Sequence, residues 1–253
     1  MAIYAMTGGA TGIGAAIKES LRSDGHSVIV ADIKDADIIC DLSTADGRQA
    51  AIAGIASACN GALNGFIACA GVATHVPNKI LIPAVNYYGT TELMDGVAGL
   101  LASNKGAAVL ISSNSAPMST DSEFVDLLLD SDENAALEHV ENIDGQAAYS
   151  GSKQAVARWM RRNVSRFAQL GVRINAIAPG YTQTPMTQAV EESEEYGQAI
   201  RDFMASIPVG RPGQPEDMAK ATSFLLSDAA SFICGSVIFV DGGHDAMLRP
   251  DQF

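Results

Sequence analysis

The stretch Tyr149-Ser-Gly-Ser-Lys153 places a phenol and an ammonium group four residues apart. At the start of a helix, this spacing puts both side chains on one face. A tyrosine normally loses its proton near pH ~10, but a nearby positive charge favours the phenolate. The pair therefore predicts a phenol that acts as a general acid or base nearer neutral pH. Because the same spacing is common on solvated helix faces, the prediction depends on what the rest of the chain supplies.

A glycine-rich segment near the N-terminus predicts a binding site for phosphate groups. An apolar run at residues 3–6 is followed by Thr7-Gly8-Gly9-Ala10-Thr11-Gly12-Ile13-Gly14 and then by a helical pattern. A strand, a glycine turn and a helix N-terminus in this order direct backbone N–H groups and the helix dipole at an anion. The spacing differs from the usual G-x-G-x-x-G, and a glycine turn without a ligand is the alternative.

Asp32 supplies a second feature of a dinucleotide site. It follows the apolar run at residues 28–31 and lies about twenty residues past the glycines, as in dinucleotide-binding folds. A carboxylate at this place accepts hydrogen bonds from the ribose hydroxyls of the adenosine and repels a 2′-phosphate. Thr11 in the glycine loop is not basic, and Lys34 is the one nearby positive charge. We therefore expect NAD(H) rather than NADP(H).

These residues need a scaffold, and the apolar runs indicate a parallel sheet. The runs alternate with helical segments through all 253 residues without a linker rich in Pro or Ser, which predicts one α/β unit spanning 1–253. They are nearly continuous, as in strands that are buried on both faces. We expect a doubly wound, mainly parallel sheet with helices on both faces and strands at 3–6, 28–31, 38–39, 66–70, 107–112, 172–178 and 237–240.

Composition and charge exclude several classes of function. The net charge of −13 argues against nucleic-acid binding, which needs a basic surface. No apolar run approaches the ~20 residues that span a bilayer, and the N-terminus lacks a basic signal-peptide region, so we expect a cytoplasmic protein without a membrane contact. Cys40, Cys59, Cys69 and Cys234, like the four histidines, show no metal-ligand spacing, and no metal site is expected.

With the glycine loop, Asp32 and the Tyr149/Lys153 pair, the chain resembles the short-chain dehydrogenase/reductase family along nearly all its length. Further landmarks of the family follow in order: Asp41-Leu42 beside the adenine, Ala70-Gly71 in the cofactor wall, Asn86 and Ser113 of the catalytic set, and Pro179-Gly180-x-Thr182-x-Thr184 at the nicotinamide carboxamide. Ala68-Cys69-Ala70-Gly71 departs from the family's Asn-Asn-Ala-Gly, because neither asparagine is present. The resemblance implies a Rossmann-type sheet of seven strands.

The resemblance also implies a mechanism and a set of site residues. Tyr149 exchanges a proton with the substrate hydroxyl, Ser113 hydrogen-bonds the substrate oxygen as charge develops there, and Lys153 holds the nicotinamide ribose. Asn86 anchors a water that passes protons from Lys153 towards solvent. The implied catalytic residues are Asn86, Ser113, Tyr149 and Lys153. The implied NAD-binding residues are Gly8, Thr11, Gly12, Ile13, Gly14, Asp32, Asp41, Leu42, Ala70, Gly71, Tyr149, Lys153, Pro179, Gly180, Thr182 and Thr184.

The segment 114–148 departs from the family because it is unusually long. Residues 124–129 and 135–140 predict two short helices, and nine carboxylates with no Lys or Arg occur between Asp121 and Asp144. Such a charged run is most often a solvated face, but its apolar residues need a surface to pack against. In many family members the Tyr149 helix packs across a subunit interface. We therefore expect this acidic helical insertion to favour a homodimer, through a surface such as 232–240, over a homotetramer.

The segment 182–207 is expected to close over the substrate. Its methionines and aromatic residues suit an adaptable apolar pocket, although routine core contacts of two short helices explain them equally well. The candidate pocket residues are Met186, Val190 and Phe203, together with His75 from the loop after Gly71.

Within the family, the chain resembles a bacterial subgroup of 3α-hydroxysteroid dehydrogenase/carbonyl reductases at 41–45, 85–89, 91–95 and the tail 241–253. The resemblance implies NAD(H)-dependent interconversion of a secondary alcohol and a ketone on an apolar cyclic substrate. A smaller alicyclic, terpenoid or aromatic alcohol is the alternative substrate, and a hydroxyacyl thioester is disfavoured because few cations are available to hold it. A dinucleotide-binding regulator without catalysis is the alternative from another class, and the complete set of four catalytic residues argues against it.

Overall fold

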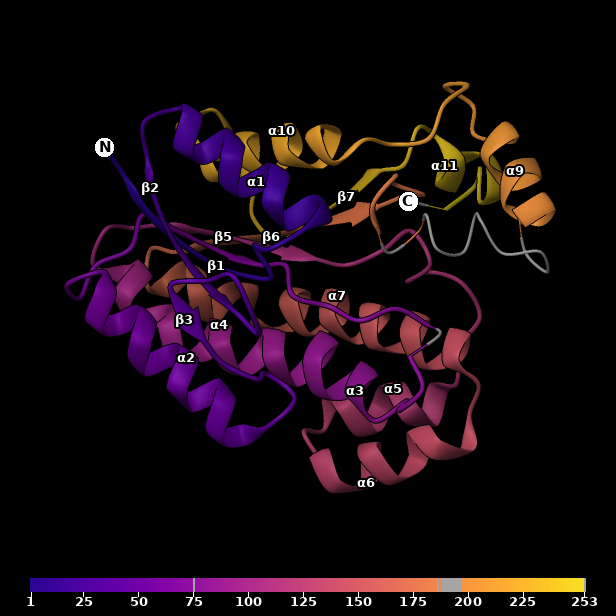
Figure 1. Ribbon diagram of the computed structural model, residues 1–253, viewed down its shortest axis with the longest axis horizontal. Coiled ribbons are helices and arrows are strands. Elements are labelled where there is room, and N and C mark those ends of the chain that lie inside the picture. Colours follow the sequence, from indigo (N-terminus) through magenta and orange to yellow (C-terminus); the bar gives the residue numbers. More distant parts are fainter. Residues whose placement is uncertain (75, 186, 188–196, 253) are drawn as a thin grey trace.

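The computed structural model describes residues 1–74, 76–185, 187 and 197–252. Within these residues, parallel strands form one seven-stranded sheet in the order β3-β2-β1-β4-β5-β6-β7. The chain begins in the middle of the sheet, winds to one edge and then returns to build the other (Figure 1). This is the doubly wound, Rossmann-type sheet that the sequence predicts. The strands are β1 (Ile3–Thr7), β2 (Ser27–Asp32), β3 (Ile38–Ile39), β4 (Gly65–Ala68), β5 (Ala107–Ile111), β6 (Arg173–Pro179) and β7 (Val237–Val240).

Helices cover both faces of the sheet. Figure 1 shows α1 and α10 on one face and α2, α4 and α7 on the other. The longer helices are α1 (Gly12–Ser23), α2 (Ala45–Ala58), α4 (Gly89–Ala102), α7 (Gly145–Gln169) and α10 (Pro215–Leu226). The shorter ones are α3 (Leu81–Pro83), η1 (Ala84–Tyr88), α5 (Ser122–Leu129), α6 (Glu133–His139), η2 (Val140–Asn142), α9 (Gly197–Ala205), η3 (Asp228–Ala230) and α11 (His244–Leu248). Within the described ranges, no helix is long and apolar enough to cross a membrane.

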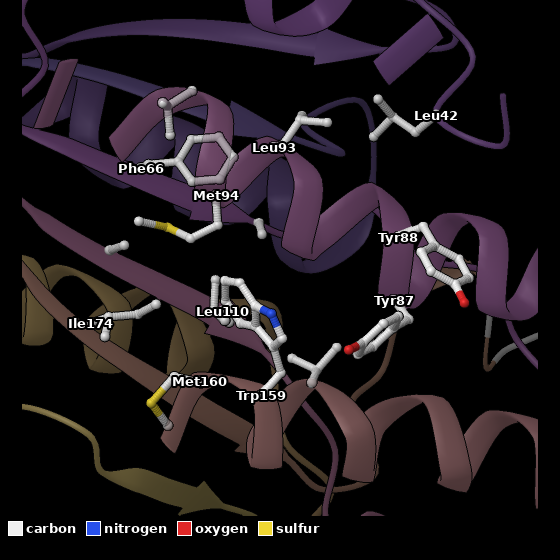
Figure 2. Packing of buried hydrophobic residues seen from close by; sticks show 14 of the residues in the cluster. Leu42, Phe66, Tyr87, Tyr88, Leu93, Met94, Leu110, Trp159, Met160 and Ile174 are labelled. Atoms are coloured by element: carbon white, nitrogen blue, oxygen red, sulfur yellow. The ribbon is translucent and has the colours of Figure 1, made fainter. Parts of the chain in front are cut away.

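Side chains that alternate along the strands form two cores, one beneath each helical layer. On β1, Tyr4 and Met6 belong to the core under α1 and α10, whereas Ala5 belongs to the core under α2, α4 and α7. Figure 2 shows this second core, in which Phe66 of the sheet packs near Met94 of α4. Because both faces of the strands are buried, their sequences are nearly continuous apolar runs rather than alternating ones.

The strand β4 ends at Ala68, two residues before the predicted end at residue 70. The backbone N–H groups of Cys69 and Ala70 both donate to the side-chain oxygen of Thr7, at 3.1 Å each, instead of continuing the ladder. Thr7 is itself buried at the end of β1. A threonine hydroxyl therefore fixes the turn after β4 against the glycine loop in a chain that lacks the usual asparagines.

The insertion 114–148 contains the two short helices that the sequence predicts, α5 and α6. Each begins two residues before its predicted start, because Asp121 and Asp132 are N-caps, and Asp144 caps α7 in the same way. Each carboxylate accepts a hydrogen bond from the backbone N–H three residues on, at 2.8, 3.1 and 2.8 Å respectively. Three of the nine carboxylates in this run are thus helix caps rather than a purely solvated face.

The apolar side of the insertion packs on the start of α7. Phe124 and Leu128 are fully buried members of the core shared with α4 and α7. A Cβ on Gly151 would lie 2.8 Å from Phe124 Cδ1, so this glycine makes room for the phenyl ring on the helix that carries Tyr149. Thr120 Oγ1 donates to Ala147 O at 2.7 Å, which ties the insertion to the first turn of α7.

A cation from a distant helix anchors the insertion on its other side. Arg48 of α2 is 1% exposed, although it is an arginine. Its Nε donates to Glu92 of α4 at 2.8 Å, and its Nη2 contacts both carboxylate oxygens of Glu133 in α6, at 2.9 and 3.0 Å. The insertion, which has no Lys or Arg of its own between Asp121 and Asp144, therefore receives a guanidinium charge from the body of the fold.

Candidate active site

The loop between β1 and α1 is packed so closely that side chains do not fit at two of its glycines. Gly8 has a φ of +73°, and a Cβ there would lie 2.5 Å from Ala70 Cα. A Cβ on Gly14 would lie 1.7 Å from Gly8 O, so the first turn of α1 packs directly on the loop. Thr11 is the N-cap of α1, and its side chain forms no capping hydrogen bond. The backbone N–H groups of the first turn are therefore available to an anion.

A cavity of about 380 Å³ lies between this loop and the start of α7. Many of the predicted cofactor-binding residues line it: Gly8, Thr11, Gly12, Ile13, Gly14, Asp32, Asp41, Leu42, Ala70, Gly71, Tyr149, Lys153 and Thr184. Its other lining residues are not predicted as site residues: Ala10, Ile33, Lys34, Cys40, Cys69, Val72, Val85, Ile111 and Pro185. Nearly all of these are sequence neighbours of predicted residues, so adjacency to a motif is the signal that would have found them.

Asp32, at the end of β2, holds the glycine loop and lines the cavity at the same time. Its Oδ2 accepts a hydrogen bond from the N–H of Ala10 at 3.1 Å, and its Oδ1 accepts one from the N–H of Ile33 at 2.7 Å. The other lone pairs of the carboxylate are available to hydroxyl groups of a ligand. Lys34 lines the same cavity, so a positive charge stands near the carboxylate.

Tyr149 and Lys153 extend from the first turns of α7 to the cavity. Lys153 Nζ lies 5.9 Å from the centroid of the Tyr149 ring and donates to the carbonyl oxygen of Ile111 at 2.9 Å. Burial lowers the pKa of Lys153 to about 8. The four-residue spacing thus brings the two side chains close together, and the lysine is held by the end of β5.

The pKa of Tyr149 is raised, in the direction opposite to the one that the Tyr149/Lys153 spacing predicts. Burial of the phenol is the main cause, and a hydrogen bond with the Ser113 side chain acts in the lowering direction. Desolvation disfavours the phenolate more strongly than the hydrogen bond with Ser113 favours it. The spacing in the sequence indicates the partner of Tyr149 but not the depth at which the pair is buried.

Ser112 and Ser113 follow β5 and have different partners. Ser112 Oγ donates to the carbonyl oxygen of Lys153 at 2.9 Å, which fixes α7 against the strand end. Ser113 is buried and forms the hydrogen bond with Tyr149. Of the two adjacent serines, the one that meets the phenol is therefore Ser113, the predicted catalytic serine.

Asn86 lies in the π-helical turn η1 that precedes α4. Its Oδ1 accepts a hydrogen bond from the N–H of Val72 at 2.8 Å, and its Nδ2 donates to Val72 O at 3.1 Å. The Nδ2 also reaches Ser152 Oγ in α7 at 3.3 Å. The side chain of Asn86 thus joins the turn after Gly71 to the helix of Tyr149, and a π turn at such a place is typical of functional sites.

The rim after β6 is formed by residues 179–184. Pro179 ends β6, and a Cβ on Gly180 would lie 2.6 Å from Asp241 Cβ, so only glycine allows this close approach. Thr182 is buried, and its Oγ1 donates to Gly180 O at 3.0 Å. Thr184 lines the cavity. Pro179, Gly180 and Thr182 therefore support the rim, and Thr184 is the member of the motif at the cavity wall.

Phe203, on α9, lies in an aromatic cluster rather than in the lining of the cavity. Its ring is T-shaped to the buried His244, with centroids 4.5 Å apart, and lies 6.2 Å from the ring of Tyr181. These contacts favour a packing role for Phe203 over contact with a ligand. The other predicted pocket residues lie outside the described residues: His75, Met186 and Val190.

Cys69 stands in the cavity wall where the family pattern has an asparagine. Burial raises the pKa of its thiol to about 12, and the charge of Lys153 acts in the opposite direction. The thiol is therefore protonated at neutral pH and serves as a small neutral wall residue. In the part of the chain that the structure describes, no three His, Cys, Asp or Glu side chains are grouped so that they could hold a metal ion.

Comparison with known proteins gives matches over the whole chain. Residues 134–245 match a family model described as enoyl-(acyl carrier protein) reductase. The 3-alpha-hydroxysteroid dehydrogenase/carbonyl reductase of Comamonas testosteroni is 41% identical over 100% of both chains. The cis-4-hydroxycyclohexanecarboxylate dehydrogenase of Sinomonas cyclohexanicum is 29% identical over 97% of both chains.

A solved structure is similar over nearly its full length. The 3-alpha-hydroxysteroid dehydrogenase of Pseudomonas sp. B-0831, complexed with NADH, superposes with a TM-score of 0.95. It is 44% identical, and the match covers 99% of this chain and 100% of that chain. The two chains therefore share the same Rossmann-type fold.

Proposed function

Because the chain belongs to the short-chain dehydrogenase/reductase family, we propose that it is an NAD(H)-dependent oxidoreductase that interconverts a secondary alcohol and a ketone. The observation that carries the proposal is the convergence of Tyr149, Lys153 and Ser113 beside a cavity whose opposite wall is the glycine loop. These residues come from α7 and from the end of β5, so the fold is what brings them together.

The cavity suits a dinucleotide. The main chain at Gly8 and Gly14 provides backbone N–H groups for a pyrophosphate, and a Cβ on Gly71 would lie 3.6 Å from Lys153 Nζ, so Gly71 leaves room beside the ammonium group. Asp32 supports NAD(H) over NADP(H), since its carboxylate repels a 2′-phosphate. The solved Pseudomonas neighbour is a complex with NADH. A bound nicotinamide accepts the hydride in oxidation and supplies it in reduction.

Tyr149 exchanges the proton in this proposal. In oxidation the phenolate takes the proton of the substrate hydroxyl, and in reduction the phenol gives it to the carbonyl oxygen. Ser113 donates a hydrogen bond to the same oxygen as charge develops there. Lys153 holds the ribose and, while it is protonated, favours the phenolate. Asn86 keeps the turn after Gly71 in place and anchors the water that leads protons from Lys153 to solvent.

An apolar cyclic alcohol or ketone, such as a 3-hydroxysteroid, is the proposed substrate. Val72, Val85 and Ile111 give the cavity apolar walls. The relatives from Comamonas and Pseudomonas, both more than 40% identical, are hydroxysteroid dehydrogenases by name. A smaller alicyclic alcohol is the second candidate, because the Sinomonas relative is named for a cyclohexane ring. The intact catalytic set argues against a dinucleotide-binding regulator without catalysis.

A substrate panel tests this proposal. NADH fluorescence is followed with steroid ketones, monocyclic ketones and a hydroxyacyl thioester analogue, and NADPH is compared with NADH. We expect turnover of 3-ketosteroids with NADH and a lower kcat/KM for monocyclic ketones. NADH binding without turnover of any ketone would indicate the regulator, and a preference for NADPH would overturn the role of Asp32.

Tyr149→Phe tests the proton transfer separately from binding. Because general acid–base catalysis contributes ~10² to 10⁴ in rate, we expect kcat to fall by about a thousandfold while the Kd for NADH stays within about twofold. Tyr88→Phe is the matched control, since Tyr88 is also a buried tyrosine and its hydroxyl has no hydrogen-bond partner within the described ranges. Retained turnover in Tyr149→Phe would refute the assignment.

We also propose that the protein is a homodimer formed through the surface of 232–240. β7 is an edge strand whose residues are only partly buried, and Phe232 just before it is fully exposed. An exposed strand edge with a large apolar neighbour is typical of a surface that pairs with a second copy. Light scattering tests this, with Phe232→Glu expected to give monomers. A tetramer that persists in high salt would contradict it.

A further inference from the structure

Ser115, two residues after Ser113, belongs to no motif, yet it contacts the oxygen of the proposed catalytic serine twice. Its backbone N–H donates to Ser113 Oγ at 3.1 Å, and its own hydroxyl donates to the same oxygen at 3.0 Å. Both serines are 7% exposed, so water competes little for these hydrogen bonds. The two donors therefore determine how the Ser113 hydroxyl is used.

The turn that carries Ser115 is fixed from both ends. At its start, the N–H of Asn114 donates to Pro179 O at 2.9 Å, which links it to β6. Within the turn, the N–H of Met118 donates to Ser115 O at 3.0 Å. From α7, Gln154 Nε2 donates to Ala116 O at 2.7 Å. Ser115 thus keeps its position relative to the helix of Tyr149.

The hydrogen bonds of Ser113 can be counted. A serine hydroxyl has two acceptor positions and one proton. The N–H and the hydroxyl of Ser115 occupy both acceptor positions of Ser113. With both acceptor positions filled, the Ser113 hydroxyl can only donate a hydrogen bond on the side where Tyr149 lies. With one acceptor position vacant, the same hydroxyl would be free to rotate and to accept a proton there instead of donating one.

We propose that Ser115 is a positioning residue that compels Ser113 to donate its hydrogen bond to the substrate oxygen. The proposal rests on the proposed function, because it assumes that Ser113 faces that oxygen. Donation into the Ser113 oxygen also polarises its O–H bond, since hydrogen bonds in a chain strengthen one another. Ser115 itself touches neither the substrate nor the cofactor in this arrangement; it acts through Ser113.

Ser115→Ala tests the proposal, because it removes the hydroxyl and keeps the backbone N–H. We expect kcat for a 3-hydroxysteroid, or for the best substrate of the panel, to fall about tenfold, the size of one hydrogen bond lost in the transition state. The Kd for NADH stays within about twofold, since the cofactor wall is unchanged. The pH midpoint of kcat/KM for oxidation moves upward, because in the free enzyme a weaker hydrogen bond from Ser113 stabilises the Tyr149 phenolate less.

A double variant separates positioning from a structural role. In Ser113→Ala, Ser115 has no hydroxyl to orient, so adding Ser115→Ala lowers kcat no further than about twofold. Ser115→Thr keeps the hydroxyl and restores most of the rate. Thr222→Val is the matched control, since Thr222 is a buried residue of α10, on the opposite face of the sheet, and its hydroxyl has no hydrogen-bond partner among the described residues.

Each outcome has one meaning. A kcat for Ser115→Ala within about twofold of wild type, or a full tenfold loss repeated on the Ser113→Ala background, would overturn the positioning role. An unchanged pH midpoint with a lowered melting temperature would also count against it, because that pattern indicates packing alone. If Tyr149→Phe and Ser113→Ala both keep wild-type turnover, the proposed function itself has failed.

Discussion

Arg48 and Lys153 are both buried cations, but they differ in whether a carboxylate lies beside them. Arg48, between the body of the fold and the insertion, is paired with Glu92 and Glu133. Lys153, in the cleft, donates to the carbonyl oxygen of Ile111 and forms no ion pair with a carboxylate in the described part of the chain. Burial accordingly lowers the pKa of Lys153 to about 8.

The difference separates a structural charge from a reactive one. A buried cation with two carboxylate partners is neutralised, so it fixes the elements that contribute the partners. A buried cation without such a partner remains able to interact with a ligand. In the free protein its desolvation lowers the free energy of unfolding. By this criterion the insertion stabilises the fold. The cavity instead holds a charged group, Lys153, that remains able to interact with a ligand.

The two regions also differ in which part of the chain builds them. The wall of the cavity at the glycine loop is formed by main chain. Its glycines cannot be replaced by larger residues without displacing neighbouring atoms. The insertion is made of side chains, through three aspartate caps and the ion pair to Glu133. Four variants test this contrast, in order of decreasing expected effect.

Gly8→Ala is expected to have the largest effect. Its Cβ would lie 2.5 Å from Ala70 Cα, so the backbone of the loop must move. Together with the strain of a positive φ, we expect NADH affinity to fall by about a thousandfold, measured by fluorescence titration. Gly25→Ala is the matched control, because Gly25 has a φ of +81° and no atom of the described part of the chain lies within 4 Å of its Cβ position. Equal losses in both variants would mean that strain alone, and not the close approach, matters.

Glu133→Ala tests the insertion in the same way. It leaves Arg48 buried without its bidentate partner, and we expect the free energy of unfolding to fall by about 3 kcal/mol in urea titrations. Replacing both residues, in Arg48→Met/Glu133→Ala, should recover most of the loss, since a buried pair is often no more stable than an apolar one. NADH affinity should stay within about twofold in each folded variant, because one lost ion pair outside the cleft leaves the cofactor contacts intact.

An exposed ion pair provides the reference for Glu133→Ala. Arg166 and Asp95 form a pair in which both side chains are about half exposed, so Asp95→Ala should cost less than about 1 kcal/mol. A loss at Glu133 as small as the loss at Asp95 would show that the insertion does not depend on Arg48. A loss of NADH binding in a folded Glu133→Ala protein would show that the insertion shapes the cleft.

The main-chain region was the more predictable of the two from the sequence. A glycine that leaves room for a neighbouring backbone is visible in the sequence by its type and its spacing. Residues 8–14 therefore predicted both the turn and a phosphate-containing ligand. The order of Ser113, Tyr149 and Lys153 then predicted three residues that the structure brings together. The direction of the pKa shift of Tyr149 was predicted incorrectly, because spacing reports which groups meet and does not report how deeply they are buried.

The side-chain region was predictable only in outline. The apolar spacing indicated α5 and α6, but the partner of Glu133 lies 85 residues earlier in the chain, at Arg48. No local pattern connects residues so far apart. Ser115 was missed for a different reason, since a serine in a turn is too common to carry information until the two hydrogen bonds to Ser113 are known.

Lys153→Met tests whether the unpaired charge of Lys153 lowers the free energy of unfolding. The pKa of Lys153 is about 8 in the folded protein, against 10.5 for a lysine exposed to water, so between these pH values the unfolded chain binds the extra proton. The free energy of unfolding of the wild type should therefore rise with pH relative to Lys153→Met, by about 2 kcal/mol between pH 8 and 10. Below about pH 7 the difference should be constant, since the lysine is then protonated in both the folded and the unfolded state.

Urea titrations across this pH range measure the difference between the two proteins. Ionisation of the buried tyrosines and cysteines also affects stability at high pH, but it does so in both proteins and is largely removed by the subtraction. Parallel curves for the wild type and Lys153→Met from pH 8 to 10 would mean that Lys153 bears no desolvation cost. The contrast with Arg48 would then fail.

Thr120→Val has the smallest expected effect, and it tests whether the support given by the insertion reaches the chemistry. It removes the hydrogen bond from Thr120 Oγ1 to Ala147 O in the first turn of α7. We expect a loss of about 1 kcal/mol in the free energy of unfolding, with Thr120→Ser close to wild type. Because Ser112, Gln154 and Asn86 also hold α7 in place, kcat/KM should change by less than about twofold. A tenfold fall in kcat at an unchanged melting temperature would instead make the insertion part of the machinery that positions Tyr149.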